Sequence, residues 1–181
     1  MIVQKTKLDD VYLIQPKVFN DKRGHFFESF NQQKFQETIG EKVNFVQDNQ
    51  SCSNKGVLRG MHFQKPPYAQ GKLVRVIKGS VIDVAIDIRK NSPTYGKYIM
   101  EELNEKNHSM LFLPEGIAHG FITLEDHTIF TYKCTNYYNK DAEGSIIWND
   151  ANLNIQWPNI NPVISEKDQI AKKFSSFASP F

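Results

Sequence analysis

Two histidines lie in short segments beside glycine, and these segments hold the first candidates for proton-transfer chemistry. His62 belongs to residues 59–64 (RGMHFQ), and His119 belongs to residues 117–121 (IAHGF). Free imidazole has a pKa of about 6.5, so a histidine can accept or donate a proton near neutrality. We interpret the apolar surroundings of His62 as a partly closed pocket, and Gly120 as a point where a ligand can approach the backbone. Taken alone, each histidine is more often structural, either hydrogen-bonded in the interior or exposed in a turn.

Tyr132 is a second kind of candidate because a phenol can donate a proton. It lies in residues 128–134 (TIFTYKC), where a regular strand places it on one face with Phe130 and Cys134. That face looks enclosed, so we expect the hydroxyl to have a hydrogen-bond partner. The alternative is ordinary strand packing, in which tyrosine is common.

A set of polar side chains could bind an anionic ligand. Arginine is suited to this role because its guanidinium makes forked contacts with phosphate. Taken one by one, each member of the set is more simply a solvated surface residue. The set comprises Arg23, Glu28, Gln47, Asn49, Arg59 and Lys72.

The sequence favours neither a metal centre nor one of the common catalytic motifs. Residues 62–64 read His-Phe-Gln, so the sequence lacks the His-x-His pair that many metal sites use. A metal site needs several ligands that converge, and two distant histidines meet that need poorly. The two cysteines, Cys52 and Cys134, have no metal-ligand spacing, and no P-loop, GxGxxG, GxSxG or HExxH motif occurs. We therefore expect no metal.

Composition is that of an ordinary globular protein, and we expect one domain over residues 1–181. Of these residues 40% are hydrophobic and 23% are charged, with a net charge of only +2. That charge is too small to indicate nucleic-acid binding. We find no signal peptide and no stretch long enough to span a membrane, so we expect a cytoplasmic protein with no membrane partner.

Hydrophobic alternation predicts mainly short strands, as in a sandwich or barrel. We expect strands at 72–78, 81–88, 109–113, 119–124 and 128–134, with Gly79-Ser80 forming a two-residue hairpin turn between the first two. In the strand at 81–88, Asp83, Ala85 and Asp87 share a face that could line a polar pocket. Asn31 and Ser165 are expected to cap short helices, the first ending at Gly40. Prolines argue against a helix in residues 150–164.

Many stretches together resemble the dTDP-4-dehydrorhamnose 3,5-epimerase family. The matching segments are RGHFFE (23–28), QDNQS (47–51), GVLRGMHFQ (56–64), QGKLV (70–74), DVAIDIR (83–89), SPTYG (92–96), PEGIAHGF (114–121), YKC (132–134) and SEKD (165–168). These stretches run in order from about residue 10 to about residue 170 with family-like spacing. Met61 stands where leucine is more usual, a nearly neutral change.

The resemblance implies an all-β, cupin-type jelly-roll of antiparallel strands with a few short peripheral helices, working as a homodimer without metal or other cofactor. It implies His62 as general base, Tyr132 as general acid on the opposite face of the sugar, Asp168 as the partner of His62, and Lys72 beside the C4 oxygen. It also implies a set of residues that bind the dTDP-4-keto-6-deoxy-sugar. These are Arg23, Glu28, Gln47, Asn49, Arg59, His119, Tyr138, Glu143 and Lys167.

The expected reaction is epimerisation at C3 and C5 of dTDP-4-dehydro-6-deoxy-D-glucose, which gives dTDP-4-dehydro-L-rhamnose. A relative that inverts only C3 or only C5 needs the same base and acid, so this alternative stays open. More distant alternatives are a ketoisomerase, a metal-dependent cupin oxygenase and a sugar-nucleotide-binding module without catalysis.

Overall fold

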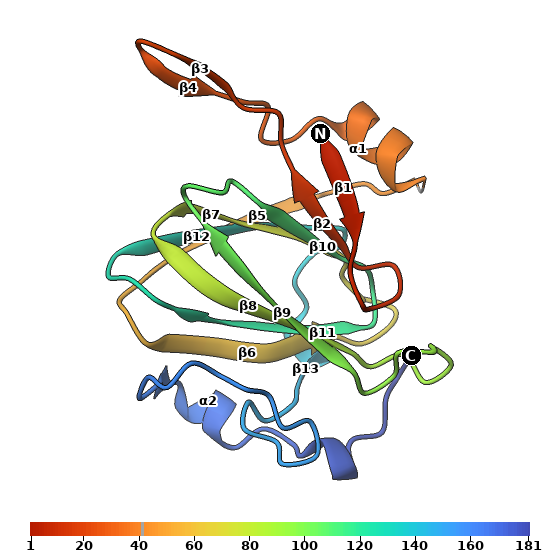
Figure 1. Ribbon diagram of the computed structural model, residues 1–181. Helices are drawn as coiled ribbons and strands as arrows, with labels where there is room; N and C mark the ends of the chain where they lie inside the picture. Colours follow the sequence, from red (N-terminus) through yellow and green to blue (C-terminus); the bar gives the residue numbers. More distant parts are fainter. Residues whose placement is uncertain (41) are drawn as a thin grey trace.

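The computed structural model describes residues 1–40 and 42–181, and its strands form two sheets that pack face to face (Figure 1). Within these residues, sheet I has the order β1 (Ile2–Lys5), β2 (Tyr12–Gln15), β10 (Met110–Leu113), β7 (Lys72–Lys78), β12 (Thr128–Cys134) and β5 (Gln47–Ser53). Sheet II has the order β13 (Glu143–Ser145), β6 (Val57–Gln64), β11 (Ile117–Thr123), β8 (Ser80–Asp87) and β9 (Tyr98–Asn104). All of these pairings are antiparallel, and β14 (Val163–Ile164) adds a parallel pairing to β6. The expected all-β architecture of antiparallel strands is confirmed.

Alternate residues of the central strands point between the sheets and form the main core. Val74 and Val76 enter it from β7, Val81 and Ala85 from β8, and Phe130 from β12. Burying a side chain such as valine or phenylalanine stabilises the fold by about 1.5–3 kcal/mol. The two-residue period of the sequence therefore gives each sheet an apolar inner face.

The outer face of sheet II is buried as well. This explains why β8 carries apolar side chains on its outer face, such as Val84 and Ile86, as well as on its inner face. Val84 and Ile86 of β8 pack with Met61 and with the C-terminal Leu153 and Ile155. The C-terminal segment runs beneath β6 in Figure 1 and includes α2 (Glu166–Gln169) and the 3₁₀ turn at Phe174–Ser176, whereas a second 3₁₀ turn, Lys140–Ala142, directly precedes β13. Residues 150–164 contain no helix, as the prolines indicated, and end in β14.

The outer face of sheet I carries α1 (Gln32–Ile39), whose Phe35 is buried against Phe112 and Leu73. The predicted caps are confirmed: the Asn31 side chain accepts from the Lys34 amide, and Gly40 ends the helix at φ +77°. Gly40 can take this left-handed conformation because it lacks a Cβ.

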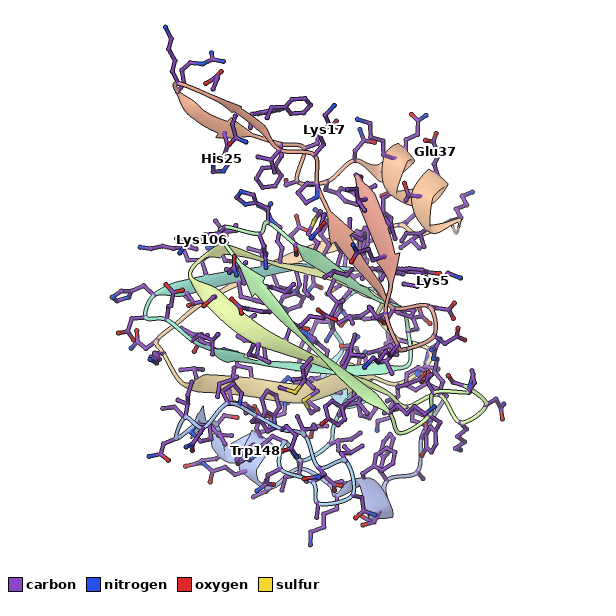
Figure 2. All side chains as sticks on the ribbon, viewed as in Figure 1. Lys5, Lys17, His25, Glu37, Lys106 and Trp148 are labelled. Carbon is purple, nitrogen blue, oxygen red and sulfur yellow. The ribbon has the colours of Figure 1, made fainter. Side chains whose placement is uncertain are left out.

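A two-stranded hairpin, β3 (Phe19–Asp21) and β4 (Gly24–Phe26), projects from the body beside α1 (Figure 1). His25 lies on this hairpin and Lys17 at its base, both outside the sandwich (Figure 2). Its side chains therefore contribute little to the core of the chain that carries them.

The predicted hairpin at Gly79-Ser80 is wrong. β7 belongs to sheet I and pairs with β10 and β12, whereas β8 belongs to sheet II and pairs with β9 and β11. Gly79, at φ +79°, carries the chain from one sheet to the other, and a Cβ there would lie 2.4 Å from Thr128 Oγ1. A glycine turn predicts a change of direction, but partner choice depends on strands distant in the sequence.

Candidate active site

A cavity of about 660 Å³ lies between the two sheets and brings together most of the predicted site residues. Sheet I contributes Asn49, Lys72 and Tyr132, and sheet II contributes His62 and His119. A smaller cavity of about 140 Å³ shares Asn49, His62, Lys72 and Tyr132 with it and extends toward Gln47, Tyr138 and Glu143. His62 and Tyr132 therefore share one space, which they line from opposite sheets.

His62 is held by Asp168, as the resemblance implied. The two side chains are 2.6 Å apart, Nε2 to Oδ1, and Asp168 is buried whereas His62 is partly open to the cavity. Ser165 caps α2 by accepting from the Asp168 amide, which places the carboxylate behind the imidazole. Burial acts to raise the pKa of Asp168, but hydrogen bonds from His62, the Gly60 amide and Ser165 outweigh it, so that the pKa falls below its usual range.

A β-bulge places Arg59 and His62 on the same face although they are three residues apart. His119 pairs with His62 and Phe121 pairs with Arg59, so two residues of β6 face one residue of β11. The extra residue fits because Gly60 and Gly120 meet: a Cβ on Gly60, at φ +140°, would lie 2.4 Å from Gly120 Cα. Gly120 thus allows β11 to approach β6 closely, whereas the sequence analysis interpreted it as a point where a ligand approaches the backbone.

Tyr132 and Lys72 face His62 from sheet I. Burial raises the pKa of the Tyr132 phenol, which keeps its proton available at neutral pH. Lys72 Nζ lies 5.8 Å from the centre of the Tyr132 ring. Burial lowers the pKa of the Lys72 amine, while the carboxylates of Asp83 and Glu143 act in the opposite direction. The face of β12 that carries Tyr132 was expected to be enclosed, but Tyr132 is only half-buried and lines the cavity.

His119 is buried within β11 and is not in an exposed turn. Its Nε2 lies 2.8 Å from Oδ2 of Asp83 on β8. Asp83 thus lies behind a residue of the cavity, on the face of β8 that the alternation marked as polar. The sequence analysis placed Asp83 on a face that could line a polar pocket but assigned it no individual role, although a carboxylate in an apolar strand was a signal.

Tyr138, Glu143 and Lys167 gather at the edge of the smaller cavity. The Tyr138 hydroxyl donates to Glu143 Oε2 at 3.2 Å, and Lys167 forms an ion pair with the other oxygen of Glu143. Gln47 accepts from the Tyr138 amide at 2.9 Å and donates to Asn49 at 3.0 Å. These side chains form a continuous polar border along the smaller cavity.

Gln64 was missed as a site residue by the sequence analysis. It donates to the carbonyl of Tyr137 at 3.1 Å and accepts from the Asn139 amide at 2.7 Å, which fixes the backbone around Tyr138. Its spacing of two residues from His62 on one strand was the available signal.

Arg23 and Glu28 lie outside both the larger and the smaller cavity. Arg23 is on the projecting hairpin, where its side chain is 84% exposed and pairs with Asp21. Glu28 forms an ion pair with Lys34 of α1 and accepts from Asn31. In one chain the structure therefore separates these two predicted ligand-binding residues from the others; Arg59, by contrast, lines the larger cavity.

Among residues 1–40 and 42–181, no group of three or more histidine, cysteine or acidic side chains is placed to hold a metal ion. None of the helices in the same residues has the length and apolar character needed to cross a membrane.

The sandwich and its internal cavity place the chain among the cupin-type proteins. The family model described as dTDP-4-dehydrorhamnose 3,5-epimerase matches residues 5–176. The dTDP-4-dehydrorhamnose 3,5-epimerase of Shigella flexneri is 55% identical over 174 residues, which cover 96% of each chain. The chain belongs to this family and is an isomerase of the epimerase type.

Solved structures agree with this assignment. A Legionella pneumophila 3,5-epimerase in complex with dTDP-4-keto-L-rhamnose has a TM-score of 0.94 and 43% identity, over 98% of this chain and 94% of that one. A 3'-monoepimerase from Streptomyces bikiniensis in complex with dTDP-quinovose is also similar, with a TM-score of 0.89 and 28% identity over 94% of this chain and 86% of that one. The fold is thus shared by enzymes named for two centres and for one.

Proposed function

We propose that this enzyme epimerises C3 and C5 of dTDP-4-dehydro-6-deoxy-D-glucose to give dTDP-4-dehydro-L-rhamnose. The observation that carries the proposal is the position of His62 and Tyr132, which line the same cavity from opposite sheets. Inversion of a carbon requires removal of a proton from one face of the sugar and return of a proton to the other. A base and an acid on facing sheets can divide these two steps between them.

The C4 ketone makes the hydrogens on C3 and C5 acidic, because each carbanion is stabilised as an enolate. His62 removes the proton, and Asp168 orients the imidazole and stabilises its charged form, as the carboxylate does in other His–Asp pairs. Lys72 stabilises the oxygen of the enolate, a type of contribution worth about 3–4 kcal/mol in closed sites. Tyr132 then returns a proton from the opposite side, and its raised pKa means that it carries this proton at neutral pH.

The remaining residues hold the nucleotide and the sugar. Arg59, Gln47 and Asn49 offer donors for the diphosphate, and His119 contacts the sugar from β11. Tyr138, Glu143 and Lys167 receive the nucleoside end, where the ring of Tyr138 is 56% exposed and free to stack on thymine. Binding energy from these remote contacts keeps the reacting carbons between base and acid.

The positions of Arg23 and Glu28 support a homodimer as the working unit. The hairpin that carries Arg23 projects away from its own cavity and exposes Phe19 and Phe26 by 52% and 67%. The outer face of sheet I also has a groove of about 320 Å³ lined by Leu73, Arg75 and other residues. A second copy that covers this face can place each hairpin, with Arg23 and Glu28, at the cavity of the other chain.

Inversion at a single centre is the second candidate, since the similar Streptomyces bikiniensis enzyme is named a 3'-monoepimerase. Incubation of the protein with dTDP-4-keto-6-deoxyglucose in heavy water, followed by NMR, separates the two. Deuterium at both C3 and C5 together with the L-rhamno product supports the proposed function. Deuterium and inversion at one centre support the second candidate, and no exchange at either centre contradicts both.

A further inference from the structure

Asp83 is a carboxylate in the apolar core between the sheets. It is fully buried on β8, between Val81 and Ala85, which belong to the main core. A buried carboxylate is costly unless its oxygens have partners. Oδ2 accepts from Nε2 of His119 at 2.8 Å, but Oδ1 is buried with no hydrogen-bond partner in the part of the chain that the structure describes.

Asp87, on the same face of β8, is an aspartate with a structural role and can be compared with Asp83. Its Oδ1 accepts from Arg89, and its Oδ2 accepts from Arg89, Ser92 and Thr94, so both oxygens are satisfied and a loop is fixed. Among the described residues Asp83 has one hydrogen-bond partner, His119, and that partner lines the cavity. The cost of burying Asp83 is therefore linked to the position of His119 and not to the anchoring of a loop.

His119 is a neighbour of His62, and the two have matching support. They are paired residues on β11 and β6, both line the larger cavity, and each imidazole Nε2 meets an aspartate from another element. The ring of His119 also lies parallel to Phe130, at 20° and 6.0 Å between centres. Two His–Asp pairs thus lie side by side. In the proposed function both members of the first pair, His62 and Asp168, have a role, whereas in the second pair only His119 has one and Asp83 has none.

We propose that Asp83 is a positioning residue for substrate binding and turnover, which fixes the tautomer and orientation of His119; this rests on the proposed function. A carboxylate can only accept, so the hydrogen of His119 stays on Nε2. Nδ1 is then the ring nitrogen available to the sugar. Loss of Asp83 frees the ring to rotate and exchange tautomers, and a misplacement of about 1 Å in an active site can cost about a hundredfold in rate.

The direct test is Asp83→Asn, whose amide can donate to Nε2 and favour the other tautomer. We expect kcat/KM to fall about a hundredfold, with thermal unfolding still cooperative. The matched control is Glu101→Gln, because Glu101 is the residue paired with Asp83 on β9 and has no hydrogen bond to His119 among the described residues. Glu101→Gln should stay within about twofold of the wild-type protein. A full-rate Asp83→Asn enzyme, or an equal loss in the control, would overturn the inference.

A double-mutant cycle separates positioning from a general structural role. If Asp83 acts through His119, Asp83→Asn causes no further loss of kcat/KM in a His119→Gln background. If the two losses multiply in full, Asp83 does not act through His119 and the inference is wrong. Asp83→Ala, which removes the acceptor in a core where Ala85 already packs, repeats the cycle if the asparagine variant does not fold.

Imidazole nitrogen NMR gives a readout that needs no catalysis. In ¹⁵N-labelled protein, with the His119 signal assigned by its loss in His119→Gln, we expect hydrogen on Nε2 in the wild-type protein and a changed pattern in Asp83→Asn. An unchanged pattern contradicts the inference even if the enzyme is active. If Asp83→Asn changes the protonation pattern of His119, control of His119 by Asp83 is upheld. If the wild-type protein at the same time exchanges no deuterium into the sugar, the proposed function is rejected independently.

Discussion

His62 on β6 and Tyr132 on β12 belong to different sheets, yet their side chains line the same cavity. They are 70 residues apart in the sequence, and the sandwich brings them together by packing the inner faces of its sheets. Asp168 and Lys72 approach the same space from α2 and β7.

Asp168→Asn should lower kcat by about 10²- to 10⁴-fold, because an amide cannot hold the imidazole of His62 in the same tautomer and charge state. Glu166→Gln is the control, since Glu166 is exposed on the same helix. Steady-state kinetics on the two variants check this. A loss of similar size in both would show that the helix as a whole, and not the carboxylate, matters.

The same variant has a predicted pH signature in stability. The pKa of Asp168 is lower in the folded protein than its unfolded value of about 3.9, so its ionised form stabilises the fold above that pH. This contribution is lost as the pH falls through the lowered value. Urea unfolding at pH 7 and near pH 3 should therefore show a wild-type advantage over Asp168→Asn that shrinks in acid; a constant difference contradicts the assignment.

Lys72→Met should reduce kcat about 10²- to 10³-fold and yet stabilise the protein by about 1 kcal/mol. Burial lowers the pKa of the amine, so the folded state bears the cost of a charged, buried group below that value. The gain in the free energy of unfolding should be largest near neutral pH. It should shrink as the pH rises toward the pKa of about 10.4 that lysine has in the unfolded chain. Urea titrations at two pH values test this, with the exposed Lys78→Met as control. A variant less stable than the wild type would contradict the account of Lys72.

Gly60→Ala should destabilise the protein by more than about 2 kcal/mol, because the new Cβ would meet Gly120 Cα at 2.4 Å and the φ of +140° is unfavourable. Gly40→Ala is the matched control: its φ is also positive, but a Cβ there has nothing within 4 Å, so about 1–2 kcal/mol is expected. Equal losses in urea unfolding would show that the close approach of β6 and β11 is not limiting.

Mixing two impaired variants tests the homodimer. Arg23→Ala chains retain an intact cavity, and His62→Ala chains retain an intact hairpin. If each hairpin serves the other chain, mixed dimers contain one complete site, and activity returns when the two are unfolded and refolded together. Recovery should be absent if Arg23 serves its own cavity. Light scattering on the same samples should give twice the mass of one chain.

Much of the fold could be predicted because it depends on local signals. The alternation in residues 128–134, the cap at Asn31 and the glycine end of α1 each act within a few residues, and all are confirmed. The pairing of His62 with Asp168 was expected from a resemblance, and its geometry is confirmed at 2.6 Å.

The errors arose where distant parts of the chain meet. Gly79 marks a turn, but only the competition among all strands decides that β7 and β8 join different sheets. The bulge opposite Gly120 and the bond from His119 to Asp83 also depend on which strands lie side by side. Arg23 and Glu28 were expected to bind the ligand, but their position on one chain does not explain such a role.

The most direct test of the central claim measures solvent deuterium exchange in His62→Ala and Tyr132→Phe beside the wild-type protein, with dTDP binding measured as a control. Without the base no deuterium should enter the sugar, whereas without the phenol proton removal should persist and inversion should suffer more. Nucleotide binding should remain largely intact in both variants. Exchange at the normal rate in His62→Ala, or equal losses of exchange and inversion in Tyr132→Phe, would contradict the division of labour between the two residues.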